Sequence, residues 1–204
     1  MAQQGVYAIV YFAEVIAASV VRGVCTHRFG RRPDDRGPLL ERWIMLLAFL
    51  AMFVLPLIYA LTSWLVWADY RLPIWMGMIG AVLFGIGIWL LWRSHVDLEH
   101  AWSAVAEIQQ GQRLVMEGVY RHVRHPMYSA HLLWGLGQVL LLQNWVAGPA
   151  MLFAQALLLL VRVPREERLL LVEFGDAYRA YMGRTGRFTP RLRPPPNGKN
   201  RLSF

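Results

Sequence analysis

Long apolar stretches alternate with short basic ones along most of this chain. Within each stretch the apolar residues follow one another almost without interruption, a pattern typical of helices surrounded by lipid rather than of half-buried strands. Five such stretches can be placed, at residues 7–24, 43–67, 73–92, 127–142 and 145–163. They predict an all-α polytopic membrane protein with about five transmembrane helices. The last two are short and lie close together in sequence, which predicts a tight antiparallel hairpin.

Two further segments have a mixed pattern. Residues 94–110 and 165–182 place apolar side chains on one helical face and charges elsewhere. The first segment predicts an interfacial helix, and the second a C-terminal amphipathic helix that covers one end of the bundle. Residues 191–204 are basic and rich in proline, which predicts a tail without fixed structure. Gly85 and Gly87 lie within an apolar stretch and follow no strand, so no Rossmann domain is predicted.

Composition agrees with a membrane protein. The chain has 204 residues, of which 56% are hydrophobic, and its mean hydropathy is +0.35. The formal charge of +8 comes from arginine-rich segments beside the apolar stretches. This placement favours contact with anionic lipid headgroups, and no nucleic-acid partner is predicted. The single cysteine, Cys25, cannot form an internal disulfide, so helix packing must hold the fold together. The N-terminus lacks the basic start of a signal peptide, which predicts that the first stretch is retained.

Positive charge predicts the orientation. The segment after the first apolar stretch carries arginines at positions 22, 28, 31, 32, 36 and 42, whereas the N-terminus before that stretch has none. By the positive-inside rule the N-terminus lies outside and the first loop is cytoplasmic. With five spans, the two ends of the terminal hairpin and the C-terminus then reach the cytoplasmic side.

Charged residues gather at those two hairpin ends. Pro126 predicts a helix start and pushes His125 out of the helical conformation. Across the hairpin, Arg162 and Glu166 are four residues apart and share a helical face, where they can bind an anionic and a cationic group. The side chain of Glu167 points roughly 100° away from this face. A metal site is not predicted, because His122 and His125 flank a helix-breaking proline and no further pair of ligands completes a coordination shell.

These residues resemble the isoprenylcysteine carboxyl methyltransferase family, whose wider group includes phospholipid methyltransferases. The matching elements are Leu114-Val115, Gly118-Val119-Tyr120, residues 124–128, residues 162–169 and residues 174–181. The resemblance implies an integral membrane methyltransferase that uses S-adenosylmethionine, with residues 1–110 forming N-terminal spans and an interfacial helix and residues 111–190 the methyltransferase core. It assigns cofactor binding to Gln112, Arg113, Leu114, Val115, Tyr120, His125, Pro126, Met127, Tyr128 and Glu166. It assigns catalysis to Arg162, which would orient the acceptor, and to Glu167.

The acceptor stays open at this point. The resemblance implies a lipophilic acceptor from the bilayer, and Arg162 suggests a carboxylate, but a thiol, an amine or another lipid would also fit. An amine would need a general base, for which Glu167 or His125 is available. Gln112 stands where the family often has histidine, and Ala130 where it often has glycine. Two alternatives remain: an NADPH-dependent membrane reductase related to the sterol reductases, and a non-enzymatic membrane protein. The oligomeric state cannot be read from the sequence.

Overall fold

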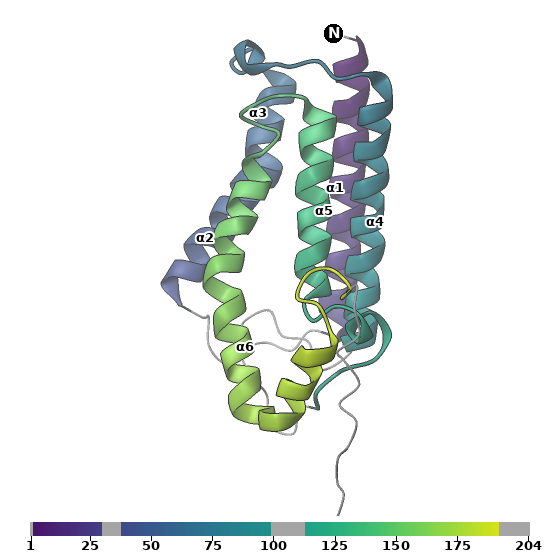
Figure 1. The fold of residues 1–204 in the computed structure, drawn as a ribbon. Helices are drawn as coiled ribbons and strands as arrows, with labels where there is room; N and C mark the ends of the chain where they lie inside the picture. Colours follow the sequence, from purple (N-terminus) through teal and green to yellow (C-terminus); the bar gives the residue numbers. More distant parts are fainter. Residues whose placement is uncertain (1, 30–37, 99–112, 192–204) are drawn as a thin grey trace, which may run out of the picture.

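A computed structural model describes residues 2–29, 38–98 and 113–191. Its elements are the α-helices α1 (Ala2–Phe29), α2 (Leu39–Phe49), α3 (Leu55–Leu61), α4 (Ile74–Leu98), α5 (Pro126–Leu142) and α6 (Ala150–Arg184), the π-helix η1 (Leu50–Val54), and the 3₁₀ turns η2 (Val66–Ala68) and η4 (Gly118–Arg121). The described residues form the long helical segments α1, α2 to α3, α4, α5 and α6, which run alternately up and down along one axis (Figure 1). The described residues contain no β-strand, only two isolated bridges. The predicted all-α architecture is confirmed.

Judged by length and apolar composition, the described helices include fewer candidate membrane spans than the sequence predicted. Three segments meet these criteria, Gln4–Phe29, Leu39–Leu61 and Ile74–Leu98. The last two predicted spans correspond to α5, which has 17 residues, and to α6, which has 35. The described residues therefore support a helical membrane fold with three candidate spans. The predicted number of about five transmembrane helices is not confirmed. The orientation across the membrane stays a prediction.

Two predicted helix boundaries were wrong. The interfacial helix was expected to begin at residue 94, but α4 continues through Ser94 and His95, both buried, and ends at Leu98. The remainder of that predicted helix, and the predicted domain boundary at residue 110, lie outside the described residues. The C-terminal amphipathic helix is not separate either. It continues the last apolar stretch within α6, which bends at Gly175, where φ is 49°.

The core is formed where α4 and α5 pack closely together. Gly80 of α4 faces Gly137 of α5, and a Cβ added to Gly137 would lie 2.8 Å from the carbonyl oxygen of Gly80. The lack of side chains at both positions allows the two backbones to approach, as in many membrane helix pairs. Helix α1 packs beside this pair, and its Tyr11 contacts Phe84 of α4 edge to face. These three helices form a rigid wall.

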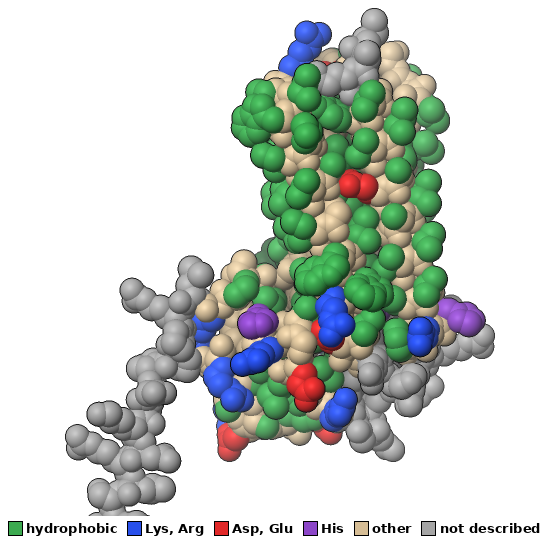
Figure 2. Space-filling model, turned by 90° about the vertical axis from the view of Figure 1, so that its right-hand side faces the viewer, with side chains coloured by type: hydrophobic (Ala, Val, Ile, Leu, Met, Phe, Trp, Pro, Cys, Tyr) green, Lys and Arg blue, Asp and Glu red, His purple; other side chains and the backbone are tan. Residues whose placement is uncertain are grey.

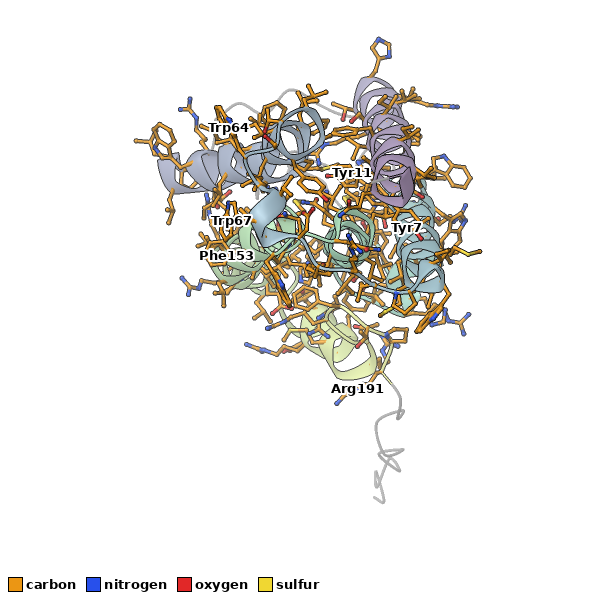
Figure 3. All side chains as sticks on the ribbon, turned by 90° about the horizontal axis from the view of Figure 1, so that it is seen from above. Tyr7, Tyr11, Trp64, Trp67, Phe153 and Arg191 are labelled. Atoms are coloured by element: carbon orange, nitrogen blue, oxygen red, sulfur yellow. The ribbon has the colours of Figure 1, made fainter. Side chains whose placement is uncertain are left out.

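A buried polar cluster attaches α2 and α3 to that wall. Pro56 has no amide hydrogen to give to the carbonyl oxygens of Met52 and Ala51, four and five residues before it. The hydroxyl of Tyr11 lies 2.6 Å from the oxygen of Met52, and Nε2 of Gln138 donates to the oxygen of Ala51 at 3.0 Å. The Tyr11 hydroxyl also lies 2.9 Å from Oε1 of Gln138, whose amide nitrogen donates a second bond to the carbonyl oxygen of Ala147. Figure 3 shows Tyr11 on the inner side of α1.

The predicted hairpin is tight only at its turn. The connection occupies residues 143–149, and Asn144 fixes it by donating to the Leu65 carbonyl oxygen at 2.7 Å and to the Asp69 carboxylate at 2.9 Å. From this turn α5 and α6 diverge downward, and α6 lies against α2 instead (Figure 1). At its lower end Arg165 of α6 donates to the buried carboxylate of Glu41 on α2 at 2.7 Å. A tight antiparallel packing along the whole hairpin was therefore a wrong prediction.

The surface reflects a membrane environment. Figure 2 shows an apolar column on one face, with most of its arginine and histidine side chains gathered at the lower end. The lower ends of α5 and α6 also lie there (Figure 1). Of the predicted basic tail, only Arg191 belongs to the described residues.

The polar cluster generates a stability prediction. In Gln138→Leu, the carbonyl oxygens of Ala51 and Ala147 lose their donors while they remain buried. We expect a loss of roughly 1–3 kcal/mol, which lowers the thermal unfolding midpoint of the detergent-solubilised protein.

The neighbouring variant Leu136→Ala is the control, because Leu136 is exposed on the outside of α5. It should unfold within a degree or two of wild type. If Gln138→Leu unfolded at the same temperature as this control, the cluster would not hold α2 and α3 in place.

Candidate functional site

The lower end of α5 is shaped by its first residues. Pro126 begins the helix and His125 precedes it with non-helical dihedral angles (φ −123°, ψ 62°), as the sequence predicted. The chain after α6 returns beneath this helix start. The amide of His125 donates to the carbonyl oxygen of Arg187 at 3.0 Å, and the hydroxyl of Ser129 donates to that of Phe188 at 2.6 Å. We call residues 185–189 the C-terminal strap. The strap holds His125 in place from below.

Glu166 connects the two walls of the site. Its Oε1 accepts hydrogen bonds from the Tyr128 hydroxyl at 2.7 Å and from Nε of Arg162 at 2.8 Å. Its Oε2 lies 3.6 Å from Nδ1 of His125. The four-residue spacing of Arg162 and Glu166 therefore produces the expected pair, and Tyr128 joins it from the opposite helix. The described structure brings these four predicted site residues together.

Glu167 has a different set of partners. Its carboxylate accepts from Nε of Arg124 at 3.3 Å, from Nε of Arg187 at 3.1 Å and through a second contact from Nη2 of Arg187, and it lies 3.3 Å from Nε2 of His125. Burial alone would raise the pKa of this carboxyl, but the hydrogen bonds and positive charges of His125 and Arg187 prevail and lower it to about 2. The imidazole of His125 thus lies between two carboxylates.

A large cavity opens beside this cluster. Its volume is about 960 Å³, and α1, α2, η1, α4, α5 and α6 all contribute to its wall. Seven of the predicted site residues line it: Tyr120, His125, Pro126, Met127 and Tyr128 from the α5 side, and Arg162 and Glu166 opposite them on α6. Farther from the cluster the wall is apolar, with Met52, Phe53 and Trp134 among its residues. One end of the cavity is therefore suited to a polar group and the other to a hydrocarbon.

A smaller pocket of about 70 Å³ lies next to it and shares Tyr120 and Arg124 with the cavity wall. Arg113, Leu114 and Val115, which the resemblance assigns to cofactor binding, line this pocket. Gln112 lies outside the described residues.

The turn that shapes this pocket depends on one glycine. Gly118 has a φ of +55°, which side chains other than glycine rarely adopt, and a Cβ there would overlap the carboxylate of Asp97. That carboxylate instead accepts a hydrogen bond from the amide of Val119 at 2.8 Å. The turn directs Tyr120 inward, where burial raises the pKa of its hydroxyl and keeps it protonated.

The pocket also contains a buried hydroxyl without a partner. Tyr178 is 1% exposed, and its hydroxyl forms no hydrogen bond with any residue that the structure describes. A buried hydroxyl of this kind is costly unless a ligand or water bonds to it. The exposed cation of Arg113, the apolar Leu114 and Val115 and the carboxylate of Glu166 together match a ligand with a carboxylate, an aromatic base and a cationic group. Tyr178 lies in the matching element at residues 174–181, but the resemblance did not assign it to the site.

Comparison with known proteins agrees with this architecture. Residues 78–172 match the model of the isoprenylcysteine carboxyl methyltransferase family. Protein-S-isoprenylcysteine O-methyltransferase of Schizosaccharomyces pombe is 40% identical over 70 residues, 33% of this chain and 29% of that protein. Protein-S-isoprenylcysteine O-methyltransferase B of Arabidopsis thaliana is 29% identical over 112 residues, 54% of this chain and 57% of that protein. This chain thus aligns with only part of the length of either relative.

The fold has a counterpart among solved structures. The structure of the eukaryotic intramembrane Ras methyltransferase ICMT matches 88% of this chain and 62% of its own, with a TM-score of 0.53 and 21% identity. At that identity the match concerns the fold. The resemblance predicted from the motifs is confirmed: residues 78–172 carry the sequence signature of the isoprenylcysteine carboxyl methyltransferase family.

Proposed function

We propose that this chain is an integral membrane methyltransferase that uses S-adenosylmethionine and methylates the carboxylate of a lipophilic acceptor of the isoprenylcysteine class. One observation carries the proposal: the hydrogen-bonded cluster of Tyr128, Glu166 and Arg162 lies on the wall of a cavity that is apolar farther in. The relatives are named protein-S-isoprenylcysteine O-methyltransferases, which supports the same reaction class.

The residues present fit the cofactor. On the wall of the smaller pocket, Arg113 can pair with its carboxylate, Leu114 and Val115 with the faces of its adenine, and the Tyr178 hydroxyl with a further polar group. Glu166, on the wall of the adjoining cavity, can pair with its ammonium group. When bound, S-adenosylmethionine supplies an electrophilic methyl group. Tyr120 belongs to the walls of both the pocket and the cavity, so a ligand there can reach the space where the acceptor would lie.

Arg162 would orient the acceptor carboxylate. Its Nε is bonded to Glu166, which fixes the plane of the guanidinium group, and its side chain lines the cavity. A carboxylate is already nucleophilic at neutral pH, so the site needs to align it and exclude water rather than remove a proton. This requirement favours an acid over an amine as the acceptor.

Glu167 suits a positioning role. A carboxyl whose pKa is about 2 is a poor proton acceptor near neutral pH, and its oxygens already accept from arginines of two different segments. We assign it to holding His125 and the C-terminal strap in place. The predicted catalytic role of Glu167 is thereby refined to one exerted through its neighbours.

Cofactor and acceptor roles can be separated by two variants on α6. Glu166→Gln should weaken the binding of S-adenosylhomocysteine at least tenfold, because it removes the charge that pairs with the ammonium group. Arg162→Met should bind S-adenosylhomocysteine nearly as wild type does but transfer methyl groups at least tenfold more slowly. Calorimetric titration measures the first effect, and transfer of labelled methyl to N-acetyl-S-farnesylcysteine measures the second.

Glu173→Gln is the matched control, since Glu173 is exposed on the same helix. It should leave binding and turnover unchanged. Equal affinity of wild type and Glu166→Gln for S-adenosylhomocysteine would refute the cofactor site. Tight binding of NADPH in place of S-adenosylhomocysteine would refute the methyltransferase.

The lowered pKa of Glu167 predicts how stability depends on pH. Its folded-state pKa of about 2 lies below the ordinary value of 4.5, so its stabilising contribution is complete above pH 4.5 and is lost as the pH falls towards 2. The unfolding midpoint of Glu167→Gln should therefore lie below that of wild type at neutral pH, and the difference should shrink over this acidic range. Thermal unfolding of both proteins at a series of pH values measures it.

A constant difference over the whole range would show that Glu167 stabilises the fold without its charge. The methyl-transfer rate of wild type could also fall as the pH drops through the neutral range. If this decline were absent in Glu167→Gln, Glu167 would be assigned the role of general base.

A further inference from the structure

The polarity of the side chains on the cavity wall changes from one helical turn to the next. On α5, Tyr128 near the mouth is followed one turn farther in by His131 and then by Trp134, all three lining the cavity. On α6, which runs the opposite way, Glu166 is followed inward by Arg162 and then Leu158. Since a turn takes 3.6 residues, each step is one turn. The wall therefore has a lower band with the carboxylate, a middle band and an apolar upper band.

Four different helices contribute to the middle band. Arg22 of α1, His95 of α4, His131 of α5 and Arg162 of α6 all line the cavity. They are close enough for the charge of Arg22 to act on Arg162 and on both imidazoles. The sequence analysis placed Arg22 only in a basic segment and assigned no function to His95 or His131, so this band was missed.

The two imidazoles are held in fixed orientations. Nδ1 of His131 lies 2.7 Å from the carbonyl oxygen of Met127, and Nδ1 of His95 lies 2.8 Å from that of Leu91. Because a carbonyl oxygen only accepts, each Nδ1 must carry the proton and donate. The rings are thus fixed to their own helices, and they add polar groups to the band without adding a carboxylate.

Within the described residues, one positive charge of the middle band, that of Arg22, has no carboxylate partner. Arg162 is paired with Glu166, whereas none of the carboxylates in residues 2–29, 38–98 and 113–191 forms an ion pair with Arg22. Arg22 is exposed where it lines the cavity, so its guanidinium group is available to an anion that enters there. Directly farther in, the wall is formed by apolar side chains such as Met52, Met151 and Leu158. The band and the chamber above it therefore match one molecule with an anionic head and a hydrocarbon tail.

We propose that Arg22 binds the acceptor: together with Arg162 it receives the carboxylate of a lipophilic acid whose hydrocarbon tail occupies the apolar upper band. The inference rests on the proposed function and deepens it by naming a specificity-determining residue. Arg22 lies outside residues 78–172, so the family signature does not assign it. A lipid phosphate carries the same type of anionic oxygen, but Arg162 places this band next to Glu166 and the cofactor pocket, where a methyl acceptor has to lie.

Arg22→Met tests the assignment with two probes that differ in one group, N-acetyl-S-farnesylcysteine and its carboxamide. Wild type should bind the acid at least tenfold more tightly than the amide, and Arg22→Met should lose most of that preference. In Arg22→Met the KM for the acid should rise at least tenfold with a smaller change in kcat. S-adenosylhomocysteine should bind as it does to wild type, and Arg22→Lys should recover part of the preference.

The control is Arg28→Met, which removes the same charge from the same helix at a position where the guanidinium lies over the ring of Phe29. It should keep the preference for the acid. Measurement in vesicles of neutral lipid and in vesicles with added phosphatidylglycerol separates the two anion sources. A preference that declines as phosphatidylglycerol rises would assign Arg22 to lipid phosphate.

Full preference for the acid in Arg22→Met, with normal folding, would overturn the role of Arg22 and leave the proposed methyltransferase intact. Failure of wild type to bind either S-adenosylhomocysteine or the acid would overturn the proposed function itself.

Discussion

The missing amide hydrogen of Pro56 is the constraint on which the shape of this molecule depends. It leaves buried carbonyl oxygens on the segment formed by α2 and α3, and in a membrane such groups must find donors on other helices. Tyr11 and Gln138 provide them. The segment is thereby attached to α1 and α5, and α6, which diverges from α5 below their turn, lies against it. A cavity can persist there because the helices around it are fixed elsewhere.

The two adjacent glutamates of α6 bind different partners at the mouth of this cavity. Glu166 faces inward and joins Tyr128 and Arg162, whereas Glu167 faces the strap and joins Arg124 and Arg187. Successive helical residues point about 100° apart, so neighbours in sequence can serve two different surroundings. His125 lies between them and links both networks. The polar end of the cavity is therefore a single connected unit.

The sequence predicted the parts of this unit that depend on local spacing. Residues four apart share a helical face, so the pair of Arg162 and Glu166 could be predicted, as could the helix start at Pro126. The pairing of Glu167 with Arg187 could not, because Arg187 reaches it only through the bend at Gly175 and the strap that follows. Arg22 was missed for another reason. A cation at the end of an apolar helix has the same pattern whether it faces lipid headgroups or an internal cavity. The helix boundaries at residues 94 and 163 were wrong because charged side chains do not end a helix that can continue out of the membrane.

The C-terminal strap has a consequence for biosynthesis. Membrane helices are inserted in order as the chain emerges from the ribosome, and the backbone partners of Arg124, His125 and Ser129 at residues 186–188 are among the last described residues to be made. Until they arrive, His125 and Glu167 lack Arg187 as a partner. The nascent chain would hold its cavity in an incomplete form until residues 185–189 have been made.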